Sequence, residues 1–237
     1  MLLHIDSSAD PTADSVSRRL TDRFVTAWRA AHGGTARYRH RDLAADPVPP
    51  LTAAYTALGR RVEREGFVPP EKVPALLDGP AERREWERTR PLIEELRSAH
   101  TVLLGVPMYN FSVPAALKAW IDRVTFPGAF TDPDTGESLL RETRVVAVMA
   151  RGGGYGPGTP RAACDFQTPY LKAYFARLGV APRHLHLIAA ELTRVDVLPH
   201  LAGLEEEAAR SLDTARQRVD ALAPALASTP AAEQPSD

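Results

Sequence analysis

The chain of 237 residues is 44% hydrophobic and 25% charged, with a formal net charge of −1, which is typical of a globular protein able to bury a sizeable core. The near-neutral charge predicts no nucleic-acid or membrane partner, and no apolar run reaches membrane-spanning length. Cys164 is the only cysteine, so no internal disulfide can form, and the N-terminus lacks the basic start of a signal peptide. We therefore expect a cytoplasmic protein.

The N-terminal part of the chain predicts a strand, a helix and a second strand in succession. Residues 1–6 are mostly apolar, as in a short buried strand, and a loop containing serines follows. Apolar side chains recur at about 3.6-residue spacing from Val16 to Trp28, which indicates a helix that the glycines at 33 and 34 end. Residues 35–40 are predicted as the second strand. A doubly wound sheet begins in this order.

Residues 51–99 form a helical but interrupted segment whose role the sequence does not show. One helix is expected to start at Asp78-Gly79-Pro80, where proline suits the first turn. Pro91 is expected to kink or restart that helix. The arginines and glutamates between these prolines alternate and balance in charge, which favours a solvated helix face over a nucleic-acid surface.

The rest of the chain continues to alternate strands and helices. Three strands are predicted at residues 101–106, 144–149 and 184–189. Helices are predicted at residues 114–124, before Gly179 and at 204–222. We therefore predict one domain over residues 1–222, with 223–237 as a disordered tail. Its expected fold is α/β and flavodoxin-like, a doubly wound five-stranded parallel sheet of order 2-1-3-4-5 with helices on both faces.

This strand order would place the loops after strands one, three and four side by side. The first loop brings Ser8, Ser15 and Ser17 to a helix N-terminus, where backbone N–H groups and the helix dipole favour a phosphate. Helix capping is the alternative role of such serines. The second loop carries Tyr109, Asn110 and Phe111, which offer an aromatic platform and an amide, unless the loop is only a hydrophobic turn.

The third loop is rich in glycine, which lets the backbone approach an aromatic ring system closely. It follows the fourth strand, and no register of residues 152–158 fits the G-x-G-x-x-G dinucleotide fingerprint. A flexible loop is the alternative interpretation. A phosphate site at one end and a site for a flat heterocycle at the other predict FMN as the cofactor.

Several motifs together resemble one known family. They are Pro107-Met108-Tyr109-Asn110-Phe111, Leu117-Lys118 with Trp120-Ile121-Asp122, Arg151-Gly152-Gly153, Pro169-Tyr170-Leu171 and the early Arg41-Asp42-Leu43-Ala44. This set is similar to the FMN-dependent NADH-azoreductases, also called NADH:quinone oxidoreductases, over roughly residues 1–190. The resemblance implies a homodimer in which the neighbouring subunit partly closes each active site.

The resemblance also implies which residues contact the cofactor and substrate. The cofactor-binding candidates are Ser8, Ser15, Val16 and Ser17 for the phosphate, Pro107, Met108, Tyr109, Asn110 and Phe111 for the isoalloxazine ring, and Ala150, Arg151, Gly152 and Gly153 after the fourth strand. The substrate candidates are Phe130, Tyr155 and Arg177. Three features depart from the family pattern: Ala150 replaces a usual serine, residues 126–130 are altered, and Arg177 stands where members often present an aromatic side chain.

The predicted function is electron transfer from NADH or NADPH, through bound FMN, to a quinone, an azo compound or a similar flat acceptor in a ping-pong mechanism. Such chemistry belongs to the cofactor, so no catalytic protein nucleophile and no metal are predicted. His184 and His186 share a strand face but have no evident third ligand. The alternative is a flavodoxin-like electron carrier or FMN-binding protein without NADH turnover, although carriers normally present a strongly acidic face. A signalling receiver would need an acidic residue where Pro107 stands.

Overall fold

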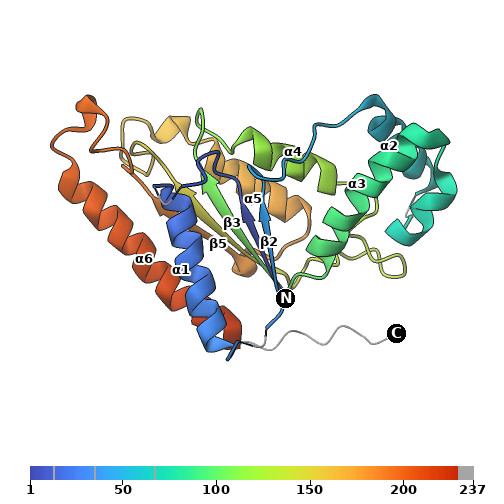
Figure 1. Ribbon diagram of the computed structural model, residues 1–237, viewed down its shortest axis with the longest axis horizontal. Helices are drawn as coiled ribbons and strands as arrows, with labels where there is room; N and C mark the ends of the chain where they lie inside the picture. The colour runs from blue at the N-terminus through green and yellow to red at the C-terminus, as the bar shows by residue number, and fades with distance from the viewer. Residues whose placement is uncertain (13, 35, 67, 229–237) are drawn as a thin grey trace.

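The computed structural model describes residues 1–12, 14–34, 36–66 and 68–228. Its centre is a five-stranded parallel sheet of order β2-β1-β3-β4-β5 (Figure 1), which confirms the predicted sheet. The strands are β1 (Leu2–Asp6), β2 (Tyr38–Asp42), β3 (Thr101–Pro107), β4 (Arg144–Ala150) and β5 (Leu185–Ala190). The order reverses direction between β1 and β3, the point at which open α/β sheets bind ligands at their carboxyl ends.

Helices cover both faces of the sheet. They are α1 (Val16–Ala31), α2 (Ala53–Glu65), α3 (Gly79–Arg97), α4 (Ala115–Val124), α5 (Gln167–Arg177) and α6 (Glu205–Ser228). Short 3-10 helices lie at Pro70–Leu76, Ala162–Cys164, Pro182–His184 and Pro199–Leu201. In the described part of the chain, none of the helices combines the length and apolar character that a membrane crossing needs.

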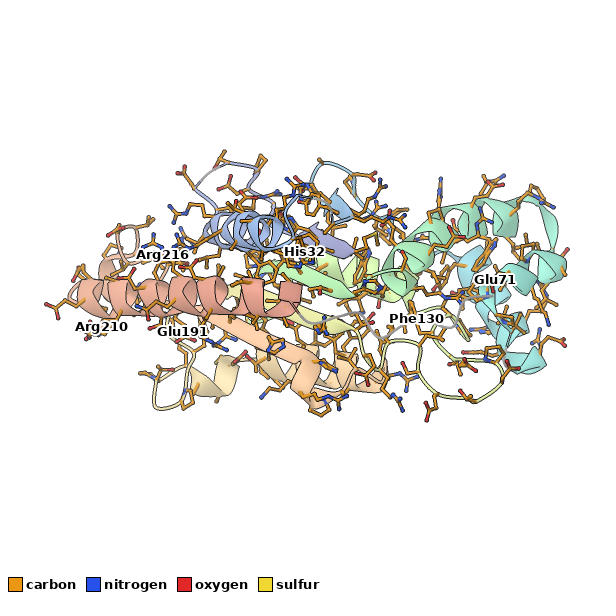
Figure 2. The ribbon with its side chains drawn as sticks, turned by 90° about the horizontal axis from the view of Figure 1, so that it is seen from below. His32, Glu71, Phe130, Glu191, Arg210 and Arg216 are labelled. Atoms are coloured by element: carbon orange, nitrogen blue, oxygen red, sulfur yellow. The ribbon has the colours of Figure 1, made fainter. Side chains whose placement is uncertain are left out.

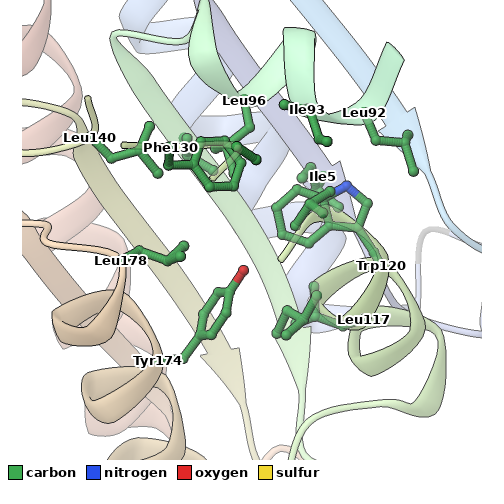
Figure 3. Close-up of a cluster of buried hydrophobic side chains, with 14 of the residues drawn as sticks. Ile5, Leu92, Ile93, Leu96, Leu117, Trp120, Phe130, Leu140, Tyr174 and Leu178 are labelled. Atoms are coloured by element: carbon green, nitrogen blue, oxygen red, sulfur yellow. The ribbon is translucent and has the colours of Figure 1, made fainter. Parts of the chain in front are cut away.

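Alternate strand residues point to opposite faces, so the sheet separates two hydrophobic cores. Leu2 and Leu103 pack with α1 and α6 on one face. Leu3 and Leu104 belong to the larger core on the other face, with residues of α3, α4 and α5. Figure 3 shows part of this larger core, in which Trp120 of α4 lies among aliphatic side chains. The inner strands β3 and β4 are apolar at nearly every position because both of their faces are covered, whereas the edge strand β2 is polar and partly exposed.

Residues 51–99 form α2, a 3-10 helix and α3, which lie on the side of the sheet opposite α1 and α6 (Figure 1). Figure 2 shows Glu71 of this segment at the opposite end of the molecule from Arg210 of α6. The fully buried Arg123 of α4 fastens the segment to the sheet layer, because its Nη1 donates to Glu85 Oε2 of α3 at 2.9 Å. The same guanidinium donates to the carbonyls of Pro49 and Pro50.

Three local predictions are wrong. Pro91 does not restart α3, which runs from Gly79 to Arg97. Pro91 and Glu87 lie on its exposed side, where water can satisfy the Glu87 carbonyl that loses its donor. The second strand is Tyr38–Asp42 rather than 35–40, of which residue 35 lies outside the described residues. The predicted tail begins too early, because α6 continues to Ser228 and buries Ala223 in the core beside α1. Residues 229–237 of that tail lie outside the described residues.

Candidate functional site

The β1–α1 loop gathers three buried hydroxyl groups at the N-terminus of α1. Ser15 Oγ donates to Ser8 Oγ at 3.0 Å and lies 3.3 Å from Ser17 Oγ. Ser15 occupies the N-cap position, yet its side chain makes no capping hydrogen bond. The structure thus disfavours capping as the role of this hydroxyl. Hydroxyls and unpaired N–H groups at a helix N-terminus together suit a phosphate.

Arg18 holds this loop in place, a role that the sequence did not reveal. Its guanidinium donates to the carbonyls of Ser8 and Asp10, at 2.9 and 2.8 Å. It also forms a two-pronged pair with the Asp42 carboxylate at 2.8 and 2.9 Å. The hydrogen bond to Asp42 raises the pKa of Arg18, so the group stays charged. Asp42 belongs to the Arg41-Asp42 motif, but its pairing with Arg18 of α1 forms only when α1 and β2 pack together.

The β3–α4 loop presents aromatic side chains to solvent. Tyr109 is 39% exposed and Phe111 is 43% exposed, whereas a turn that only packs on the core would bury them. Asn110 and Phe111 have φ values of 47° and 72°, in the left-handed region that side chains such as phenylalanine seldom adopt. Such strain often marks a binding site. The Tyr109 hydroxyl accepts a hydrogen bond from the Ala9 N–H at 3.2 Å, so this loop touches the β1–α1 loop.

The glycine-rich loop after β4 completes the same edge. The ring of Tyr155 lies edge-on to that of Phe111, with centroids 6.2 Å apart. The backbone N–H groups of Tyr155 and Gly156 donate to Glu191 Oε2, which follows β5. Ala150 also meets the β3–α4 loop, because its carbonyl accepts the Met108 N–H at 2.8 Å. The missing serine hydroxyl at position 150 leaves this backbone contact intact.

Arg151 is buried beneath the glycine-rich loop, and neighbouring side chains pair with its charge. Nη1 donates to Glu191 Oε1 at 2.9 Å, and Nε donates to Gln167 Oε1 at 3.1 Å. Nη2 lies 3.1 Å from Asp165 Oδ2. Burial alone would raise the pKa of Asp165, but the Thr168 hydrogen bonds and the charge of Arg151 hold it below its usual range. Only the backbone of Arg151 is therefore left to face the site.

The chain matches the flavodoxin-like fold family over residues 1–220. It is 42% identical over 220 residues to an FMN-dependent NADH:quinone oxidoreductase of Nocardia farcinica, which covers 91% of this chain and 96% of the relative. The chain belongs to this oxidoreductase family. A relative of the same name from Streptomyces avermitilis is 38% identical over 95% of this chain and 96% of its own length.

A solved structure has the same fold as this member of the NADH:quinone oxidoreductase family. It is an FMN-dependent NADH-azoreductase of Bacillus anthracis in complex with FMN, with a TM-score of 0.74 and 22% identity. The alignment covers 95% of this chain and 99% of the azoreductase.

Two of the substrate candidates that the resemblance implied lie elsewhere in the molecule. Phe130 is buried, and together with Arg177 it lines a hollow before β4, at the amino ends of the strands. The Ala181 N–H donates to the Arg141 carbonyl there, which places the end of α5 beside the start of β4. Figure 2 accordingly shows Phe130 apart from Glu191. Within one chain, only Tyr155 of the three joins the aromatic loop.

Proposed function

We propose that this protein is an FMN-dependent oxidoreductase that transfers electrons from NADH or NADPH to quinones, azo compounds or similar flat acceptors. The observation that carries the proposal is the meeting, at one sheet edge, of a buried hydroxyl cluster and an exposed, strained aromatic loop. The named activities of the relatives support the same chemistry.

The hydroxyl cluster fits the FMN phosphate. Ser8, Ser15 and Ser17 are buried and bond to one another, and the Ser15 hydroxyl is not needed as a helix cap. An anion placed there would also receive the N–H group of Val16 and the positive end of the α1 dipole. Arg18 contributes by donating to the Ser8 carbonyl. This contact fixes the loop so that its backbone N–H groups are free to face the phosphate.

The isoalloxazine ring of FMN fits the β3–α4 loop and the glycine-rich loop after β4. Pro107 ends β3, and residues Met108 to Phe111 form a tight turn in which the N–H groups of Tyr109 and Ser112 each bond the other's carbonyl. The turn exposes an amide and two aromatic groups, and Tyr155 of the glycine-rich loop lies edge-on to Phe111. Exposed aromatic groups of this kind suit a flat ligand.

Bound FMN, held by the hydroxyl cluster and the two loops, would supply the hydride and electron-transfer chemistry between the nicotinamide and the acceptor. The protein's own task is to bind the cofactor, to orient the donor and acceptor, and to exclude water from the site. The Asn110 amide and loop N–H groups would donate to the ring edge and so stabilise the negative charge of the reduced ring. Tyr155 and Phe111 provide one apolar surface for both the nicotinamide donor and the electron acceptor. Because the two would occupy this surface one after the other, we propose a ping-pong order.

We also propose that the active assembly is a homodimer. Phe130 and Arg177 lie far from the flavin edge of their own chain, so they contribute to substrate binding only if a second subunit brings them to its neighbour's site. A two-fold dimer is the commonest arrangement that would supply two equivalent sites. The family resemblance implied the same assembly. The cytoplasmic location stays a prediction.

The central test uses Asn110→Gly. Glycine accepts the positive φ of 47° at this position, so the substitution removes the amide without straining the turn. We expect flavin reduction by NADH, measured by stopped-flow bleaching, to slow by about tenfold to a hundredfold, at or below the roughly 10²- to 10³-fold loss seen for one oxyanion-hole donor. The control is Asp134→Gly, a matched change in an exposed turn before β4.

Three results would count against the proposal. Purified protein without FMN would remove the cofactor assignment. A yellow protein whose flavin is not bleached by NADH would instead be a carrier. An unchanged reduction rate and FMN affinity in Asn110→Gly, with a lowered melting temperature, would make the loop a structural turn.

A further inference from the structure

Three potential metal ligands meet on the neighbouring strands β1 and β2. His4 and His40 are direct partners in the parallel register, and Asp6 lies two residues after His4 on the same strand. Asp6 Oδ2 is 3.2 Å from His4 Nε2 and 3.0 Å from His40 Nε2. One ligand atom from each side chain lies within 4.8 Å of the others. The phosphate loop begins immediately after Asp6, but none of these side chains contacts the proposed FMN site.

The surroundings of the His4 side chain are those of a metal-binding histidine. It is 1% exposed, and its Nε2 makes no hydrogen bond of good geometry, which is costly for a buried polar atom. Its other ring nitrogen, Nδ1, lies 2.9 Å from the Tyr38 hydroxyl. Metal-binding histidines almost always bond a second group through the other nitrogen, which sets the ring orientation and the tautomer.

Asp6 Oδ1 accepts a hydrogen bond from Thr21 at 3.1 Å. Its Oδ2 faces both histidines and accepts a hydrogen bond from His40 Nε2 at 3.0 Å, which an ion bound between these atoms would replace. Gly105 of β3 makes room for the carboxylate, because a Cβ there would lie 2.5 Å from Asp6 Oδ1. Arg18 Nη1 is 3.6 Å from Oδ2, but this guanidinium is paired with Asp42. Two carboxylates and one guanidinium leave the cluster negative when both histidines are neutral.

We propose that His4 Nε2, Asp6 Oδ2 and His40 Nε2 bind one divalent transition-metal ion of the zinc class. Two imidazoles and a carboxylate are suitable ligands for such ions. Tetrahedral binding at zinc distances sets donor atoms roughly 3.3 Å apart, close to the 3.2 and 3.0 Å that separate Asp6 Oδ2 from the two histidine nitrogens. The His40 side chain is 40% exposed, so solvent reaches the position where a fourth, water ligand would bind. The site is separate from the flavin chemistry.

The test is a zinc titration of the purified protein after dialysis against EDTA. Calorimetry and metal analysis are expected to show one Zn²⁺ per chain and a melting temperature that rises with zinc. His40→Ala should abolish saturable binding while the half-exposed position preserves folding. Tyr38→Phe, which removes only the hydroxyl on His4 Nδ1, should weaken zinc binding by about 10- to 100-fold.

The control is His184→Ala. His184 Nε2 lies 3.0 Å from Glu142 Oε2, a histidine–carboxylate pair that belongs to no three-ligand group among the described residues. This variant should bind zinc like the unaltered protein. Binding that survives His40→Ala, binding lost in His184→Ala, or no saturable zinc uptake at one ion per chain would each overturn the proposal.

Discussion

Ser15→Ala separates phosphate binding from helix capping at the start of α1. Serine at an N-cap normally stabilises its helix, and its loss then costs about 0.5–2 kcal/mol of stability. In this protein the Ser15 side chain makes no capping hydrogen bond and instead joins the hydroxyls of Ser8 and Ser17. We therefore expect Ser15→Ala to weaken FMN binding while the stability of the flavin-free protein changes little.

The size of the effect follows from the charge of the ligand. A hydrogen bond to a charged group contributes about 1.5–3 kcal/mol. At about 1.4 kcal/mol per tenfold change, one lost contact to the phosphate should raise the Kd for FMN about 10- to 140-fold. Quenching of flavin fluorescence on titration with the flavin-free protein measures this Kd, and urea unfolding of the same protein measures stability.

Thr52→Ala provides the matched control. Thr52 caps α2, where its hydroxyl oxygen accepts a hydrogen bond from the Tyr55 N–H at 3.3 Å, far from the proposed flavin site. This variant should lose about 0.5–2 kcal/mol of stability and keep its FMN affinity. If Ser15→Ala behaved like Thr52→Ala, with reduced stability and an unchanged Kd, the phosphate assignment would be refuted.

Three further predictions concern the scaffold and the assembly. Arg123→Leu should lower the free energy of unfolding by about 3–5 kcal/mol, because it removes the buried partner of Glu85 and leaves only the exposed Arg88 beside that carboxylate. A urea midpoint close to that of the unaltered protein would show that the Arg123–Glu85 pair is dispensable. Arg151→Lys should weaken FMN binding in fluorescence titrations, since one ammonium group cannot hold Gln167 and Glu191 together, and an unchanged Kd would mean that the glycine-rich loop is set without it. Light scattering should show a dimer at micromolar concentration, whereas a fully active monomer would contradict the proposed assembly.

The sequence by itself determined the order of the elements and the loops that form the candidate site. Short apolar runs are typical of parallel strands covered by helices, and this pattern is local, so β1, β3, β4 and β5 were predicted to within a residue or two. The loops rich in serine, aromatic residues and glycine follow those strands directly. Since parallel strands end at one edge, their convergence was predictable from topology alone.

Contacts between distant segments were decided only by the tertiary structure. Arg151 was a candidate cofactor ligand by its motif, but folding surrounds its side chain with groups from α5 and the end of β5. Phe130 and Arg177 lie at the far edge because α4 and α5 run back across the sheet. His4 meets His40 only through the register of β1 and β2, and a shift of one residue would turn them to opposite faces. Such pairings depend on how helices and strands pack against one another, and the spacing of residues along the chain does not predict that packing.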